Sequence, residues 1–283
     1  MNFPDRSYPA KVLLFGEHTV LLGGSALAMP FQKYNCTWIT DSDNLEAWWQ
    51  DFLIYLQNNC SDFLETDKLN LIYPVTPLEW NIPIGYGLGS SGAITAAIFD
   101  YAAKIKPYTL LELQKKLGLM ESYFHGKSSG YDPLISYQNT GIYKKGDQMA
   151  PWNYELSGRM FCYLVDSGVT RSGKNLIEEF RTRAISFPDV YDQIKNVNNH
   201  IIETIASGEE DIFYAVNELS QLQYDHMNYM IVDSIKSIWA DSLERKDIAF
   251  KICGAGGGGY YLVMSQKPLG KLGNFVLELI TQP

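Results

Sequence analysis

The chain of 283 residues is long enough for one large domain or two smaller ones, and its 46% hydrophobic content is ordinary for a folded protein. Asp and Glu outnumber Lys and Arg by 32 to 23, and the resulting net charge of −9 argues against a nucleic-acid partner, which normally requires a basic surface. The amino-terminal stretch has no apolar signal region, and no apolar run is long enough to span a membrane, so we expect a soluble cytoplasmic protein.

The first half of the sequence mixes strand-like and helix-like segments. Alternating or continuous apolar residues predict strand segments at 11–15, 33–40, 69–82 (broken by two prolines) and 134–144. Helical spacing of apolar residues predicts helices at 44–58, 91–104 and 109–124. The proline at position 107 is expected to end the second of these helices.

The second half of the sequence has a different texture. It predicts a short apolar strand at 160–166 and a strand, glycine loop and strand over 248–264. Long helix-like stretches are predicted at 174–183, 189–206 and 209–230. We therefore expect a domain boundary near residue 155, which gives domains at 1–155 and 156–283.

The four cysteines and four histidines indicate neither a disulfide framework nor a metal site. The cysteines form no CxxC pair, so buried free thiols are expected. The histidines lack the spacing of metal ligands.

Residues 83–97, PIGYGLGSSGAITAA, place a glycine-rich turn at the start of a predicted helix. Such a turn can hold a phosphate, because the first amides of a helix lack intrahelical partners and glycines allow close backbone approach. Ser90 and Ser91 add hydroxyls that can cap the helix or reach a metal ion. The alternative is a tight turn with an ordinary serine cap. A Walker A loop is excluded, because Glu121 occupies the position of its leading glycine.

Two further features extend this pattern. Residues 251–260, KICGAGGGGY, contain more glycines than a hairpin requires and suggest close backbone approach to a substrate or a phosphate, with a flexible hairpin as the alternative. Glu121 and Asp132 are two carboxylates that could hold a cation and handle a proton, with solvated surface charges as the alternative.

Together, these motifs resemble the GHMP small-molecule kinase superfamily, and most closely its mevalonate kinases. The segments at 9–31, 83–93 and 251–263 are similar to the three superfamily motifs, in order. The segment HGKSSGYDPLISYQNTGIY at 125–143 resembles the one that carries the catalytic aspartate, and LVDSGVTRSGK at 164–174 resembles the opening of the second domain. The resemblance spans nearly the whole chain.

The resemblance implies an α+β, two-domain GHMP kinase fold. The amino-terminal domain, 1–155, would be ribosomal protein S5 domain 2-like and carry nucleotide binding and catalysis, and the carboxy-terminal domain, 156–283, would be ferredoxin-like. The implied activity is ATP- and Mg²⁺-dependent phosphorylation of a small-molecule alcohol, mevalonate first, in isoprenoid synthesis. The partner expected is that alcohol, with neither nucleic acid nor membrane; a homodimer is left open.

The resemblance also implies roles for individual residues. Asp132 would orient or deprotonate the substrate hydroxyl, and Lys11 would stabilise charge near it. The metal ligands would be Ser90 and Glu121. Contacts to the ATP phosphates would come from Gly85, Gly87, Leu88, Gly89, Ser90, Ser91 and Gly92. Substrate contacts would come from Glu17, His18, Arg171, Gly254, Ala255 and Gly256, with Arg171 on a carboxylate.

Several positions depart from the superfamily pattern and leave the substrate open. Gly92 replaces a usual alanine, Cys253 a usual Thr or Ser, and Tyr131 a small aliphatic residue. The apolar stretch at 20–22 favours mevalonate over a sugar, and the absence of Lys and Arg from 15–28 disfavours a phosphorylated substrate. Phosphomevalonate kinase and sugar kinase remain alternatives. A catalytically inactive sensor on the same fold is the alternative from another class, disfavoured because the implied catalytic and metal residues are all present.

Overall fold

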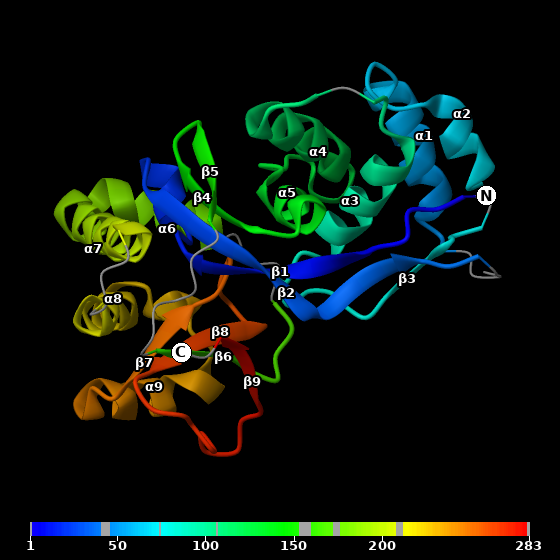
Figure 1. The fold of residues 1–283 in the computed structure, drawn as a ribbon. Coiled ribbons are helices and arrows are strands. Elements are labelled where there is room, and N and C mark those ends of the chain that lie inside the picture. The colour runs from blue at the N-terminus through cyan, green and yellow to red at the C-terminus, as the bar shows by residue number, and fades with distance from the viewer. Residues whose placement is uncertain are drawn as a thin grey trace. The chain divides into compact units, whose positions relative to one another are not determined.

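The computed structural model describes residues 2–40, 46–73, 75–105, 107–152, 160–171, 176–207 and 212–281. The chain packs into two compact units that are interleaved along the sequence (Figure 1). Unit 1 comprises Met1–Val12, Met29–Ile84 and Leu88–Gly141; unit 2 comprises Leu13–Ala28, Gly85–Gly87 and Ile142–Pro283. The predicted domain boundary near 155 lies outside the described residues and stays a prediction.

Unit 1 consists mainly of helices packed on one side of three strands. Its strands come from β1 (Ser7–Phe15), β2 (Ser25–Trp38) and β3 (Leu78–Trp80), and the first two also contribute residues to unit 2. Its helices are α1 (Trp49–Cys60), α2 (Thr66–Leu71), α3 (Ser90–Ala102), α4 (Leu110–His125) and α5 (Tyr131–Gln138). Helices α3, α4 and α5 pack on one another, and α3 is buried along nearly its whole length (Figure 1).

Unit 2 is built on a second sheet with the strand order β7-β8-β6-β9, all antiparallel. The strands of this sheet are β6 (Phe161–Asp166), β7 (Ile248–Ile252), β8 (Tyr260–Ser265) and β9 (Leu277–Thr281). Unit 2 also holds β4 (Gly141–Lys145) and β5 (Gln148–Trp152), which belong to the other sheet, where β4 pairs with β2. Its helices are η1 (Thr19–Leu22), α6 (Leu176–Ser186), α7 (Pro188–Ser207), α8 (Phe213–His226), η2 (Asn228–Met230) and α9 (Asp233–Arg245). Helices α8 and α9 pack against β7, which is buried throughout.

Several predicted elements are confirmed, and the reasons lie in local sequence. Helix α4 begins where the sequence predicts, because Thr109 and Glu112 form a reciprocal capping box. Strands β6, β7 and β8 coincide with the predicted apolar runs. The four cysteines are free and buried, as expected.

Three sequence predictions are wrong in detail. Residues 131–138, partly predicted as strand, form α5, which begins after Gly130 and ends at Asn139, both with left-handed backbone. The end of α2 occupies 69–71, where strand was predicted, and α3 ends at Ala102, well before the proline at 107. Helix α9 was not predicted at all.

Gly92 allows α5 to pack closely on α3. A Cβ at this position would lie 2.9 Å from the backbone nitrogen of Pro133 and 3.0 Å from the carbonyl carbon of Asp132. Alanine favours a helix over glycine by about 1 kcal/mol, yet here its methyl group would push α5 away. We therefore expect Gly92→Ala to lower the Tm in thermal unfolding. A Tm at or above that of the wild type would show that α5 can shift without cost.

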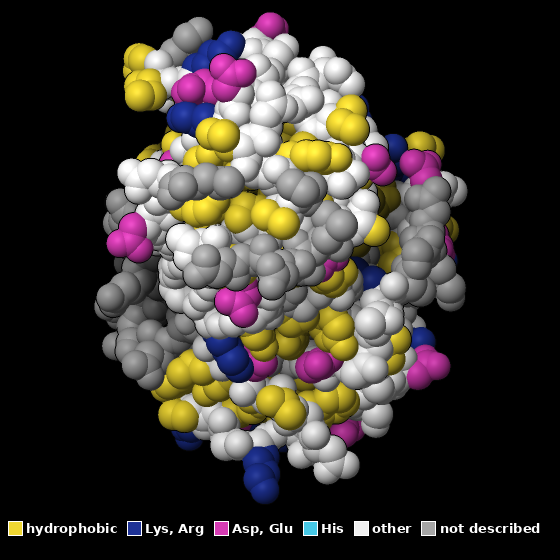
Figure 2. All heavy atoms as spheres, turned by 90° about the vertical axis from the view of Figure 1, so that its right-hand side faces the viewer, with side chains coloured by type: hydrophobic (Ala, Val, Ile, Leu, Met, Phe, Trp, Pro, Cys, Tyr) yellow, Lys and Arg dark blue, Asp and Glu magenta, His cyan; other side chains and the backbone are white. Residues whose placement is uncertain are grey.

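The surface adds little to this description. On the face drawn in Figure 2, hydrophobic side chains reach the surface in separate groups among charged ones, as is usual for folded proteins. No helix among the described residues has both the length and the hydropathy needed to cross a bilayer. Buried polar side chains are more informative than this surface, and several of them belong to two clusters, one in each unit.

Candidate active site

The first cluster lies in unit 1, around the amino terminus of α3. Gly89 precedes this helix with a φ of 76°, and no side chain caps the first turn, so its amides and the positive end of its dipole are available to an anion. A Cβ at Gly89 would lie 3.1 Å from Cγ of Lys11 and 3.4 Å from Oδ2 of Asp132. The glycine therefore lets the turn approach these two charged side chains closely.

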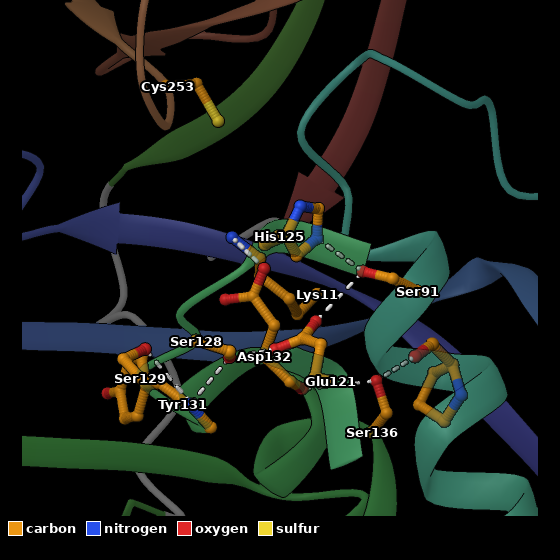
Figure 3. Close-up of polar contacts among 12 residues, drawn as sticks. Lys11, Ser91, Glu121, His125, Ser128, Ser129, Tyr131, Asp132, Ser136 and Cys253 are labelled. Carbon is orange, nitrogen blue, oxygen red and sulfur yellow. Dashed lines mark hydrogen bonds and ion pairs between the residues drawn. The ribbon is translucent and has the colours of Figure 1, made fainter. Parts of the chain in front are cut away.

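Lys11 and Asp132 form an ion pair beside this turn (Figure 3). Nζ of Lys11, from β1, lies 3.1 Å from Oδ2 of Asp132, in the first turn of α5. The lysine side chain is 8% exposed and the aspartate side chain 33%, so the carboxylate is held from one side and open on another. The Ser136 hydroxyl donates to the Pro9 carbonyl over 2.7 Å and ties α5 to β1. A carboxylate placed in this way can accept a proton, and the ammonium can stabilise developing negative charge.

Glu121, near the end of α4, is the buried carboxylate of the same cluster. The hydroxyl of Ser91 donates to its Oε1 over 2.9 Å, and the hydroxyl of Ser128 donates to its Oε2 (Figure 3). Burial and the nearby charge of Asp132 raise the pKa of Glu121 to about 7, although the two hydroxyls and Lys11 act in the opposite direction. A buried carboxylate close to a second one is a position that a cation would stabilise.

The second cluster lies in unit 2, around the glycine loop between β7 and β8. Basic side chains donate hydrogen bonds to three carbonyl oxygens at the end of β7 and in the loop that follows it. Lys251 donates to Ile252 over 2.8 Å, and Nη2 of Arg171 donates to Cys253 over 3.0 Å. Nε2 of His18 lies 3.2 Å from the Ala255 carbonyl oxygen. The loop backbone is therefore fixed by its carbonyl groups.

Arg171 fits between two residues that lack side chains. Cβ atoms built at Gly87 and Gly254 would lie 1.9 and 2.1 Å from Nη2 of the guanidinium, so a larger residue at either position would displace the guanidinium from this place. Its Nε is buried and has no hydrogen-bond partner among the described residues. The arginine thus holds the loop at Cys253 and keeps one donor unsatisfied.

Glu17 forms a buried ion pair with Lys251. Each side chain is 1% exposed, and Nζ of the lysine donates to Oε2 of the glutamate. The ammonium also faces the ring of Phe15 at 5.5 Å. Burial raises the pKa of Glu17, and the charge of Lys251 opposes that rise. This pair joins the turn after β1 to the end of β7.

Comparisons with known proteins agree with this geometry. Residues 61–139 match the family described as GHMP kinases N terminal domain. The chain is 27% identical to the mevalonate kinase of Pyrococcus horikoshii, covering 89% of this chain and 86% of that protein. It is 25% identical to the mevalonate kinase of Archaeoglobus fulgidus, covering 96% and 95%. The chain is similar to mevalonate kinases, members of the GHMP kinase superfamily, over most of its length.

Solved structures confirm the predicted α+β, two-domain fold of the GHMP kinases. The crystal structure of mevalonate kinase from methicillin-resistant Staphylococcus aureus covers 98% of this chain with 98% of its own, at a TM-score of 0.60 and 21% identity. The matched curated relatives are kinases, and this chain is accordingly a phosphotransferase.

The structure brings the predicted site residues of this kinase together in two groups. Lys11, Glu121 and Asp132 meet around the start of α3 in unit 1. The predicted substrate residues gather in unit 2, where Glu17 is held by Lys251 rather than presented as a free carboxylate. Their catalytic and substrate roles stay predictions.

Sequence reasoning assigned Ser91 to the ATP phosphates alone and missed three polar residues of these groups, His125, Ser128 and Lys251. Ser91 rather than Ser90 contacts Glu121, and its Oγ also lies 3.0 Å from Nε2 of His125. Ser128 and Lys251 were likewise not assigned. Ser128 lies between the two predicted carboxylates in sequence, which is the signal that could have identified it.

His18 gives this kinase an acid-sensitive group. Burial lowers its pKa to about 4, and the nearby charges of Arg171 and Lys251 act in the same direction. Between that value and the ordinary pKa of about 6.5, the unfolded chain binds a proton that the folded chain does not. His18 therefore contributes to stability above pH 6.5, and this contribution is lost as the pH falls towards 4.

We expect His18→Gln to flatten the decline in unfolding free energy between pH 7 and pH 5, measured by urea unfolding. His200→Gln is the matched control, because that histidine is exposed, and it should keep the wild-type slope. Equal slopes for wild type and His18→Gln would show that His18 takes up its proton as readily when folded as when unfolded.

Proposed function

We propose that this GHMP kinase transfers the terminal phosphoryl group of ATP, with Mg²⁺, to a hydroxyl group of mevalonate. The observation that carries the proposal is the Lys11–Asp132 ion pair, packed against Gly89 at the uncapped start of α3. Phosphoryl transfer needs a phosphate site, a partner for the hydroxyl proton and compensation of negative charge. All three are available in this one cluster.

The phosphate site would be the turn before α3 and the first turn of the helix. Gly89, Ser90 and Ser91 would offer backbone amides to the phosphates, supported by the helix dipole. The other residues proposed to contact ATP are Gly85, Gly87, Leu88 and Gly92. Gly92 has the additional packing role described above, since its missing Cβ leaves room for the start of α5.

Glu121 and the hydroxyl of Ser90 would hold the magnesium ion. The fit rests on a carboxylate that is 4% exposed and has a raised pKa, a state that a cation would relieve. Within the described parts of the chain, no three His, Cys, Asp or Glu side chains form a ready metal site. This agrees with Mg²⁺, which takes few protein oxygens and completes its shell with phosphate and water. When bound, Mg²⁺ would neutralise phosphate charge.

Asp132 would accept the proton of the substrate hydroxyl at Oδ2 or orient that hydroxyl for attack. Lys11 would hold the carboxylate in place and stabilise negative charge on the transferred group. The 33% exposure of the aspartate leaves room for a hydroxyl to reach it.

Mevalonate is favoured by the relatives and by the chemistry of unit 2. The matched relatives from Pyrococcus horikoshii and Archaeoglobus fulgidus are mevalonate kinases. Val20 and Leu21 are 40% and 42% exposed just after His18, an apolar rim suited to a methyl-bearing chain. The unsatisfied Nε of Arg171 would be available to a carboxylate. Glu17, His18, Gly254, Ala255 and Gly256 are the other proposed substrate residues.

The test is ADP release in the presence of ATP and Mg²⁺ with mevalonate, phosphomevalonate, galactose or homoserine as acceptor. Turnover with mevalonate alone would support the proposal. Turnover with another acceptor alone would retain the transfer chemistry and reject the assignment of unit 2 residues to mevalonate. Binding of ATP without turnover on any acceptor would favour an inactive sensor.

A further inference from the structure

Ser128 has a hydroxyl whose direction is fixed by its neighbours. The backbone amide of Gly130 donates to Oγ of Ser128 over 2.9 Å, so the oxygen acts as an acceptor there. Its single proton is then directed to Oε2 of Glu121, as Figure 3 shows. The side chain is half-buried and bridges the loop after α4 to the carboxylate.

This loop is itself fastened to one face of α4. Gln114, Gly118 and Ser122 follow one another at a spacing of four residues and therefore share a helix face. The Gln114 amide donates to the Ser129 carbonyl over 2.8 Å, and the amide of Ser128 donates to Oγ of Ser122 over 3.1 Å. At Gly118 a Cβ would lie 3.2 Å from the Ser128 carbonyl oxygen, so the loop lies close to the helix.

The two hydroxyls on Glu121 differ in their surroundings. Ser91 lies in the first turn of α3, where it is also proposed to contact phosphate, and its Oγ is shared with His125. Ser128 lies on the α4–α5 loop, outside the proposed phosphate contacts, and its oxygen is already engaged by Gly130. Its bond to Oε2 is therefore the one that can persist while Oε1 turns to a cation.

We infer that Ser128 is a positioning residue that fixes the Glu121 carboxylate for a divalent cation. The inference rests on the proposed function, because the cation is the Mg²⁺ that would accompany ATP. Residues that hydrogen-bond to metal ligands typically change metal affinity about 10- to 100-fold when they are removed. Ser128 acts through Glu121 and does not itself contact the metal.

The test compares Ser128→Ala with its neighbour Ser129→Ala, whose exposed hydroxyl accepts the Tyr131 amide over 3.3 Å. Calorimetry measures the Kd of a non-hydrolysable ATP analogue with Mg²⁺ and with EDTA. The ratio of the two values gives the gain in affinity due to the metal. We expect Ser128→Ala to reduce this gain at least about tenfold, with little change in the Kd measured with EDTA. Ser129→Ala should leave the gain intact.

Ser128→Thr keeps the hydroxyl and should restore the gain. If thermal unfolding shows no cooperative transition for Ser128→Ala, that variant is not folded. Ser128→Cys, whose thiol is a weaker donor of similar size, then replaces it. If the variant without the serine hydroxyl gains as much affinity from Mg²⁺ as the wild type does, this inference alone is overturned. If the wild-type chain binds the analogue equally with Mg²⁺ and with EDTA, both the metal role of Glu121 and this inference are overturned. If the wild-type chain does not bind the analogue at all, the proposed function is rejected as well.

Discussion

Asp132→Asn is expected to lower the turnover number about a thousandfold while the affinity for ATP is largely retained. Asparagine has the same size as aspartate but cannot accept the proton of the acceptor hydroxyl. It also leaves the Lys11 ammonium, which lies 3.1 Å from the carboxylate, without its negative partner. Nucleotide affinity should persist because the α3 amides and Glu121 are unchanged. Steady-state ADP release and a separate ATP binding measurement would check both expectations.

Asp100→Asn is the matched control in the same unit. Asp100 also pairs with a cation, since Oδ2 lies 3.7 Å from Arg6, and it accepts the Tyr8 hydroxyl over 2.7 Å. Its loss should lower stability without a comparable loss of turnover. If Asp132→Asn turned over at the wild-type rate, Asp132 would not be the group that handles the proton, and another acceptor would have to be found.

The sequence predicts those parts of the fold that depend on local patterns. Helix α4 is bounded by its own capping residues, and β7 and β8 are continuous apolar runs, so both can be recognised from neighbours in sequence. Helix α5 could not be recognised in this way. It is only eight residues long, and its position depends on contact with α3 at Gly92, some 40 residues away in sequence.

The candidate site, like the fold, is predictable from the sequence only where it depends on local motifs. Glycine loops and paired carboxylates are visible as motifs, and the superfamily resemblance adds a role for Lys11. Contacts such as Ser128 with Glu121 depend on how a loop folds back on α4, which no spacing rule supplies. The pairing of Glu17 with Lys251 joins residues 234 positions apart, so it can be recognised only in the folded structure.

That pair leads to the second large expected effect, on stability. Replacing Lys251 with methionine leaves Glu17 buried without its cation, and removing one partner of a buried ion pair typically costs about 3 to 5 kcal/mol of unfolding free energy. The double variant Glu17→Gln/Lys251→Met removes both charges and should recover more than half of that loss. Urea unfolding of the two single variants and the double variant gives the coupling energy. Lys145→Met is the control, because the Lys145–Glu203 pair is exposed to solvent and its loss should cost far less.

The pH dependence distinguishes a lost ion pair from lost packing. Without Lys251, burial of Glu17 is opposed only by backbone hydrogen bonds at Glu17 and Gly254, so its pKa lies further above the value in the unfolded chain. Above the unfolded pKa of about 4.3, the folded Lys251→Met variant then holds a proton that the unfolded chain has released, so its stability falls as the pH rises. The destabilisation should therefore be larger at pH 8 than at pH 5 and should lose this dependence in the double variant. A loss of equal size at both pH values would assign the effect to the contact of Lys251 with Phe15 and its neighbours rather than to its charge.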